Sequence, residues 1–164
     1  MKKVIFNNKK YTLFANPIKK NGHLFFTGTN LNLKDEELKS EHYTLVSSFP
    51  SISTNICDSQ VKWLSEIAEE FPKLSIVAIS NDLPFTLGNW CALHSVKNIK
   101  VFSDHLHHGF GYRTGLLIKE LNLLARSIIL INSRNRVVYL HINVEQNKPL
   151  PLAEIKEKLR KFAK

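Results

Sequence analysis

The sequence is poor in the residues from which several common kinds of site are built. Its 164 residues include only two cysteines, six glycines and one methionine. Two cysteines are too few for a disulfide-stabilised scaffold, and they do not form a C-x-x-C pair. The glycines lack the spacing of G-x-G-x-x-G or of a phosphate-binding loop, and there is no G-x-S-x-G elbow. These absences argue against a disulfide-rich secreted protein, a dinucleotide-binding enzyme and an elbow-type serine hydrolase.

Long apolar segments are also missing from the sequence. No uninterrupted hydrophobic run is long enough to cross a membrane, and the start MKKVIFNNKK lacks the apolar part of a secretion signal. We therefore expect no membrane association and a reducing, cytoplasmic compartment. The length is typical of one domain, so residues 1–164 are expected to form a single unit.

Positive charge is in excess, with a formal net charge of +9. Clustered Lys and Arg would indicate a nucleic-acid partner, because they displace counterions from phosphates. The basic residues are instead scattered along the chain, which is typical of charges that are simply solvated. We expect no nucleic-acid partner; a basic binding module with incidental cysteines is the alternative.

Apolar periodicity predicts an alternation of strands and helices. One apolar helical stripe leads to Pro72, which ends the helix, and a second stripe follows Pro149 and Pro151. Another helix begins after Asp82, with Asp82 as its cap and Pro84 near its first position. The order of elements predicts an α/β protein in which helices cover both faces of a mixed sheet. Strands are predicted at residues 4–6 and 11–14, which form a hairpin, and at 24–26, 43–46, 74–79, 99–102, 127–131 and 137–142. Exposed helical turns are predicted at 33–40, and a loop rich in histidine and glycine after residue 102, through Gly115.

Cys57 is the first candidate for a reactive residue. It follows a strand and a proline-containing loop, and it lies at or within the first turn of the helix that ends at Pro72. Unpaired backbone N–H groups and the helix dipole favour negative charge there, so they promote the thiolate. A buried structural cysteine is the other interpretation, because most lone cysteines are of that kind. Position alone leaves both open.

The residues around Cys57 resemble the active site of the peroxiredoxins. Pro50, Thr54 and Cys57 reproduce the pattern P-x-x-x-T-x-x-C within FPSISTNICD. Further segments resemble the thiol peroxidase branch, an atypical two-cysteine type, and the resemblance extends over residues 43–142. These segments are DLPF at residues 82–85, Trp90 with Cys91, SDH at 103–105 and LLAR at 123–126.

This resemblance implies a thioredoxin-like fold with an N-terminal β-hairpin, hydroperoxide substrates and a homodimer. It makes Cys57 the peroxidatic thiolate, Thr54 a hydrogen-bond donor to the peroxide, and Pro50 a shield against water. Arg126 would hold the thiolate and the peroxide oxygen by its charge, which stabilises the negative charge on the leaving oxygen. Cys91 would resolve the Cys57 sulfenic acid as an intrachain disulfide. Reduced thioredoxin, with no bound cofactor, would then restore the dithiol.

A few residues depart from the pattern of this family. Ser53 stands where Asp is usual, Asn55 where a small residue or proline is usual, and Thr114 where Tyr is usual. Residues 23–28 lack the Pro-Asp-Phe signature of many relatives. None of these departures touches the matched residues around the thiol.

Other residues allow further hypotheses. His105, His107 and His108 have no companion ligand at a known spacing, so we expect no metal. Phe49 and Phe85 are hypothesised to line an apolar pocket that favours organic hydroperoxides over hydrogen peroxide. A redox sensor or disulfide relay on the same fold, with little turnover, is the remaining alternative to the peroxidase.

Overall fold

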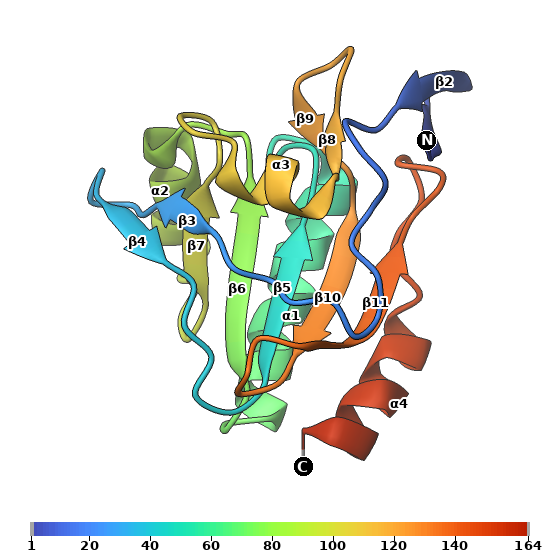
Figure 1. Cartoon of the computed structure of the whole chain (residues 1–164). Coiled ribbons are helices and arrows are strands. Elements are labelled where there is room, and N and C mark those ends of the chain that lie inside the picture. The colour runs from blue at the N-terminus through green and yellow to red at the C-terminus, as the bar shows by residue number, and fades with distance from the viewer. Residues whose placement is uncertain (1, 164) are drawn as a thin grey trace.

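The computed structural model describes residues 2–163, and its centre is a seven-stranded sheet (Figure 1). The strands are β3 (Thr27–Thr29), β4 (Asp35–Glu37), β5 (Thr44–Ser48), β6 (Ser75–Ser80), β7 (Lys100–Ser103), β10 (Ser127–Ile131) and β11 (Val137–Ile142). Their order is β11-β10-β5-β6-β7-β3-β4. The β5–β6 and β6–β7 pairs are parallel and the outer pairs are antiparallel. The predicted mixed sheet is confirmed.

Alternating side chains of the sheet divide the interior into two cores. On β6, Ile76 and Ala78 belong to the first core, whereas Val77 and Ile79 belong to the second. The first core is covered by α1 (Asn55–Glu70), α2 (Pro84–Leu93) and α4 (Leu152–Phe162), and the second includes Phe110 of α3 (Gly109–Thr114). In Figure 1, α3 lies in front of the sheet and α1 behind it. Helices therefore cover both faces, as predicted.

Asparagine-containing turns explain the two hairpins that the sequence predicts. Strands β1 (Lys3–Phe6) and β2 (Lys9–Thr12) pair around Asn7 and Asn8, whose φ angles are 50° and 63°. Asparagine adopts such angles more readily than other residues with a side chain, and a two-residue hairpin turn of this kind requires them. In the β10–β11 hairpin, Asn135 has a φ of 58°. The N-terminal hairpin is confirmed.

Three local predictions were wrong. Residues 33–40 contain the edge strand β4 rather than helical turns, because pairing with β3 outweighs the helix preference of the charged KDEEL stretch. The strand predicted at residues 24–26 lies instead at Thr27–Thr29, and the predicted loop near Gly115 contains α3. Charge patterns and short apolar runs do not reveal such tertiary pairing. Within residues 2–163, no helix combines the length and apolarity needed to cross a membrane.

Candidate active site

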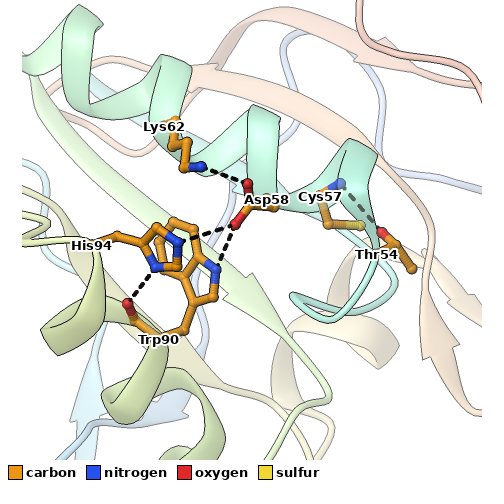
Figure 2. A network of polar contacts seen from close by, with 6 residues as sticks. All are labelled: Thr54, Cys57, Asp58, Lys62, Trp90 and His94. Carbon is orange, nitrogen blue, oxygen red and sulfur yellow. Dashed lines mark hydrogen bonds and ion pairs between the residues drawn. The ribbon is translucent and has the colours of Figure 1, made fainter.

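The loop between β5 and α1 brings three predicted site residues together. Pro50 is buried, Thr54 is the N-cap of α1 with extended backbone angles, and Cys57 is fully buried in the first helical turn. The hydroxyl of Thr54 accepts the backbone N–H of Cys57 at 3.2 Å (Figure 2) and donates to the carbonyl oxygen of Ser51 at 3.2 Å. This cap fixes where α1 starts, so the Cys57 thiol lies at the helix end that favours negative charge.

Arg126 supplies a buried positive charge beside α1. Its side chain is 2% exposed, between β9 (Leu123–Leu124) and β10. Three of its five N–H groups are used: Nη1 donates to Gln60 Oε1 at 2.7 Å, and Nε and Nη2 donate to the carbonyl oxygen of Gln146 at 3.3 and 3.0 Å. No carboxylate in the described part of the chain forms an ion pair with it. A buried guanidinium without a counter-ion attracts an anion such as a thiolate.

Gln60 connects Arg126 to the helix that carries Cys57. It lies three residues after Cys57, on the same helical face, and is 4% exposed. Its side-chain oxygen accepts from Arg126, and its amide nitrogen donates to Ser47 Oγ at 2.5 Å and to the carbonyl oxygen of Ser48 at 3.1 Å. Gln60 was not predicted from the sequence, although a glutamine inside an otherwise apolar helical stripe is a usable signal of a buried polar contact.

Asp82 has a different role from the one predicted. The N-cap of α2 is Leu83, which makes no side-chain cap, so Asp82 as a helix cap was wrong. Its carboxylate accepts from the Ser51 hydroxyl at 2.8 Å, the Ile52 N–H at 2.8 Å and the Ser80 hydroxyl at 2.6 Å. Asp82 therefore ties the loop before Cys57 to the end of β6, and its two carboxylate oxygens are occupied by these three donors.

Cys91 lies in α2, and its thiol is not joined to that of Cys57. Both cysteines are free, with Cys57 buried and Cys91 partly buried. Cys91 packs against the same core that contains Cys57. Burial raises the pKa of the Cys91 thiol, so this residue is less ready than an exposed cysteine to become a thiolate in the folded helix.

The two phenylalanines of the pocket hypothesis do not offer a common wall. Phe49 is fully buried in the first core, whereas Phe85 is 67% exposed. An apolar hollow lies instead beside the N-terminal half of α1, next to Gln60. It is lined by Asn55, Ile56, Ser59, Gln60, Pro149, Leu150 and Leu152. Between residues 2 and 163, no three His, Cys, Asp or Glu side chains are placed to share a metal ion.

Comparisons with known proteins show the family of this chain. The family model described as Redoxin matches residues 24–159. The chain belongs to the redoxin family. The thiol peroxidase of Clostridium acetobutylicum is 39% identical to this redoxin over 140 residues, which cover 84% of this chain and 85% of that relative. The match confirms the predicted resemblance, and it identifies the redoxin as an enzyme of the thiol peroxidase type.

Two solved structures confirm the thioredoxin-like fold of this redoxin. A peroxiredoxin-like protein from Aquifex aeolicus superposes with a TM-score of 0.91 at 21% identity, covering 98% of this chain and 96% of that one. A thiol peroxidase from Chromobacterium violaceum gives 0.88 at 20% identity, covering 97% and 95%. At these identities the likeness supports the fold, while the roles of individual residues depend on the geometry described above.

Proposed function

We propose that Cys57 is the peroxidatic residue of this thiol peroxidase. The observation that carries the proposal is the buried Cys57 thiol at a capped helix start, with the counter-ion-free guanidinium of Arg126 bound to the same helix through Gln60. The thiolate attacks one oxygen of a hydroperoxide, so that an S–O bond forms while the O–O bond breaks. The leaving oxygen takes a proton and departs as water or an alcohol, and Cys57 becomes a sulfenic acid.

Thr54, Arg126 and Pro50 prepare this displacement. Arg126 has two N–H groups that no described contact uses, and these are available to the thiolate and to the peroxide oxygen. The Thr54 hydroxyl lies next to the Cys57 N–H and is placed to donate to a bound peroxide in exchange for its bond to Ser51. Pro50 is buried and offers no N–H to water. Prearranged donors of this kind stabilise charge that develops on the leaving oxygen.

Cys91 completes the cycle as the resolving residue. It is the one other cysteine in the sequence, and its helix packs on the core that contains Cys57. Attack of the Cys91 thiolate on the sulfenic sulfur releases water and forms an intrachain disulfide. A reduced thioredoxin-type dithiol then supplies two electrons by exchange and becomes a disulfide itself, so no bound cofactor takes part. A thioredoxin-linked cycle places the protein in the reducing cytoplasm.

A homodimer is the proposed assembly. Leu83 and Phe85 at the start of α2, and Leu106 in the turn after β7, are exposed apolar residues. A hydrogen bond from Ser103 Oγ to the carbonyl oxygen of Asp82 joins the two segments. Exposed apolar groups gathered near a site are typical of an interface. Sedimentation of wild type and of Leu106→Asp tests this, since a dimer that uses the surface is expected to dissociate in the variant.

Mass spectrometry after one equivalent of hydroperoxide tests the cycle directly. The wild type is expected to lose both thiols and to show a Cys57–Cys91 cross-linked peptide. Cys91→Ser is expected to consume one equivalent and stall as a sulfenic acid, and Cys57→Ser to consume none. Sustained turnover with thioredoxin and its reductase separates a peroxidase from a redox sensor. Two untouched thiols in the wild type, or a Cys57→Ser variant that still cycles, would overturn the proposal.

The apolar hollow beside Gln60 supports a preference for organic hydroperoxides. Leu150 and Leu152 line it from the segment that leads into α4, and Ile56 lines it from α1. An alkyl or aryl group placed there loses contact with water, which favours binding in proportion to its apolar area. We expect kcat/KM for cumene hydroperoxide to exceed that for hydrogen peroxide, and Leu152→Ser to reduce the first value only. Equal values for both substrates would contradict this preference.

A further inference from the structure

The residues next to the two cysteines are hydrogen-bonded to each other. Asp58 follows Cys57 on α1, and Trp90 precedes Cys91 on α2. The indole Nε1–H of Trp90 donates to Asp58 Oδ1 at 2.7 Å (Figure 2). This bond joins two helices whose thiols must meet if the proposed cycle is to close.

Asp58 is the point at which several groups converge. Besides Trp90, its carboxylate contacts Lys62 Nζ at 2.9 Å and His94 Nε2 at 3.7 Å. The His94 ring stacks on Trp90 at 4.2 Å with an interplanar angle of 20°, and His94 Nδ1 lies 2.9 Å from the carbonyl oxygen of Trp90. Within residues 2–163, the side-chain hydrogen bonds and ion pairs between α1 and α2 with its cap all end on Asp58.

Helix α2 has little else to hold it in shape. It has no side-chain cap, and only Pro84 and Leu87 are buried among its ten residues. Gly88 stands in its middle with no other group within 4 Å of the place where a side chain would begin, so glycine there weakens the helix without serving close packing. A charge-assisted hydrogen bond near the C-terminal end is therefore a large share of what fixes this helix on α1.

The two sulfur atoms are not bonded to each other while this hydrogen bond is in place. In Figure 2 the Asp58 carboxylate faces Trp90 and His94, whereas the sulfur of Cys57 lies on the side of Thr54. Both thiols are free, and Cys57 is fully buried. A disulfide requires a sulfur–sulfur distance of about 2 Å and closely placed Cα atoms, and the uncapped, little-buried α2 is the element suited to move to meet this requirement.

We propose that Asp58 and Trp90 are positioning residues, whose hydrogen bond holds Cys91 away from Cys57 until the sulfenic acid has formed. The bond breaks when α2 opens, and it re-forms when thioredoxin restores the dithiol. This inference rests on the proposed two-cysteine cycle. It assigns the timing of disulfide formation to a single donor and a single acceptor, neither of which contacts the peroxide.

Four variants separate the hydrogen bond from the bulk of the side chains. Trp90→Phe keeps an aromatic ring and removes the donor; Asp58→Ala removes the acceptor. Asp58→Asn keeps an oxygen acceptor for the indole and serves as the conservative rescue. Trp63→Phe is the matched control, because Trp63 also packs partly buried against the first core but makes no bond to Asp58.

Rapid mixing with one equivalent of cumene hydroperoxide measures the two steps separately. Disulfide formation is expected to be about tenfold faster in Trp90→Phe and in Asp58→Ala, because a hydrogen bond to a charged group is lost from the dithiol form alone. Asp58→Asn keeps an acceptor without its charge and should lie between the wild type and Asp58→Ala, whereas Trp63→Phe should stay near the wild-type rate. Sulfenic acid formation, followed in the Cys91→Ser background, should be unchanged. A tenfold shift toward the disulfide also makes the reduction potential about 30 mV more negative.

Indole N–H signals in a nitrogen-edited NMR spectrum report the Trp90 hydrogen bond directly. They therefore distinguish loss of this bond from a general loss of stability. The signal that disappears in Trp90→Phe should move between the dithiol and disulfide forms of the wild type, while that of Trp63 should not. Unchanged or slower disulfide formation in Trp90→Phe, or identical rates in Asp58→Asn and Asp58→Ala, would overturn the positioning role. A wild type that forms no Cys57–Cys91 link would overturn the cycle itself, which is a separate outcome.

Discussion

Helix α1 starts at Thr54, whose hydroxyl accepts the N–H of Cys57, whereas α2 starts after Leu83 with no side-chain cap. Six residues of α1 are buried and Asp58 lies in its first turn, where a negative charge suits the helix dipole. Only two residues of α2 are buried, and Gly88 interrupts its helix-forming residues. The helix that carries Cys57 is thus fixed by more capping and packing contacts than the helix that carries Cys91.

This difference matches the separate demands of the two proposed steps. Attack on a peroxide requires a fixed sulfur and fixed donors, because misplacement raises the barrier. Disulfide formation requires that one cysteine travel, and the elements that move in proteins come from the least stable regions. The firmly held helix carries Cys57, and the loosely held helix carries Cys91. We call the β5–α1 loop, α1 and Arg126 the rigid half of the site, and α2 the labile half. Variants of the rigid half should therefore act on the first step, and variants of the labile half on the second.

The largest effect is expected when the buried charge of the rigid half is removed. Arg126→Ala should slow sulfenic acid formation by about 10²–10³-fold, since a prearranged charge at the reacting oxygen is lost. It also leaves the oxygens of Gln60 and Gln146 without their donor, which costs about 1–3 kcal/mol of folding free energy. Stopped-flow peroxide consumption and urea unfolding measure the two effects.

The exposed Arg134 provides a control for the loss of positive charge. Arg134→Ala should behave as the wild type in both measurements, because a solvated surface charge contributes little. A wild-type rate of sulfenic acid formation in Arg126→Ala would remove the guanidinium from the mechanism and leave it a purely structural role.

A smaller effect on the same half is expected from the helix cap. Thr54→Val removes the hydroxyl that accepts the N–H of Cys57, which should cost about 1 kcal/mol of unfolding free energy. Sulfenic acid formation should slow on the order of tenfold, because one hydrogen bond to a charged species is lost as well. Thr54→Ser keeps the hydroxyl and should recover most of both quantities. Equal rates in the Val and Ser variants would mean that Thr54 serves the helix alone.

The sequence predicted the local arrangement around Cys57 better than the contacts between distant segments. The spacing of Pro50, Thr54 and Cys57 is local, so a pattern is enough to place them on one loop and helix start. Gln60 was missed because its contact with Arg126 joins residues 66 positions apart in the chain. The cap assigned to Asp82 was wrong because three donors from other segments compete for its carboxylate. Such choices depend on tertiary neighbours, which local propensity does not contain.

The strand β4 was missed for the same reason. Glu36 in its middle is ion-paired with Lys100 of β7 and hydrogen-bonded to Asn30, and the Lys100 contact holds the pKa of Glu36 below its ordinary value. The charged stretch therefore gains partners as an edge strand that it would lack as an isolated helical turn. The fold class and the mixed sheet were predicted because they follow from element order, which does not depend on these contacts.

A change that strengthens α2 tests the labile half with a moderate effect. Gly88→Ala should stabilise the helix by about 0.5–1 kcal/mol and slow disulfide formation by about threefold to fivefold, since open space surrounds the position. Ala92→Gly, at an exposed position beside Cys91, should have the opposite effect. Quenched-flow alkylation of free thiols measures both rates. Shifts in the same direction in the two variants, or no shift in either, would contradict the view that α2 opens as a helix before the thiols join.

The smallest expected effect is a dependence of the stability of α2 on pH. Burial raises the pKa of Cys91 above the 9.0 of an exposed thiol. In the opened helix the thiol regains the lower value, so near pH 9 the open form loses its proton before the folded form does. The full stability of folded α2 is present while the thiol is neutral in both forms. Part of this stability is lost as the pH rises through 9 and toward the higher pKa of Cys91 in the folded form.

Thermal unfolding of the reduced protein at pH 7.5 and pH 9.5 measures this loss against Cys91→Ala as the control. The wild type should show an extra fall in Tm on the order of 1 °C, kept small because solvent partly screens the half-buried thiol. Both proteins keep Cys57, so the difference between them reports on Cys91. An identical fall in Tm in Cys91→Ala would mean that the burial of this thiol does not resist the opening of α2. The rate of opening would then be set by the weak helix and the Asp58–Trp90 contact alone.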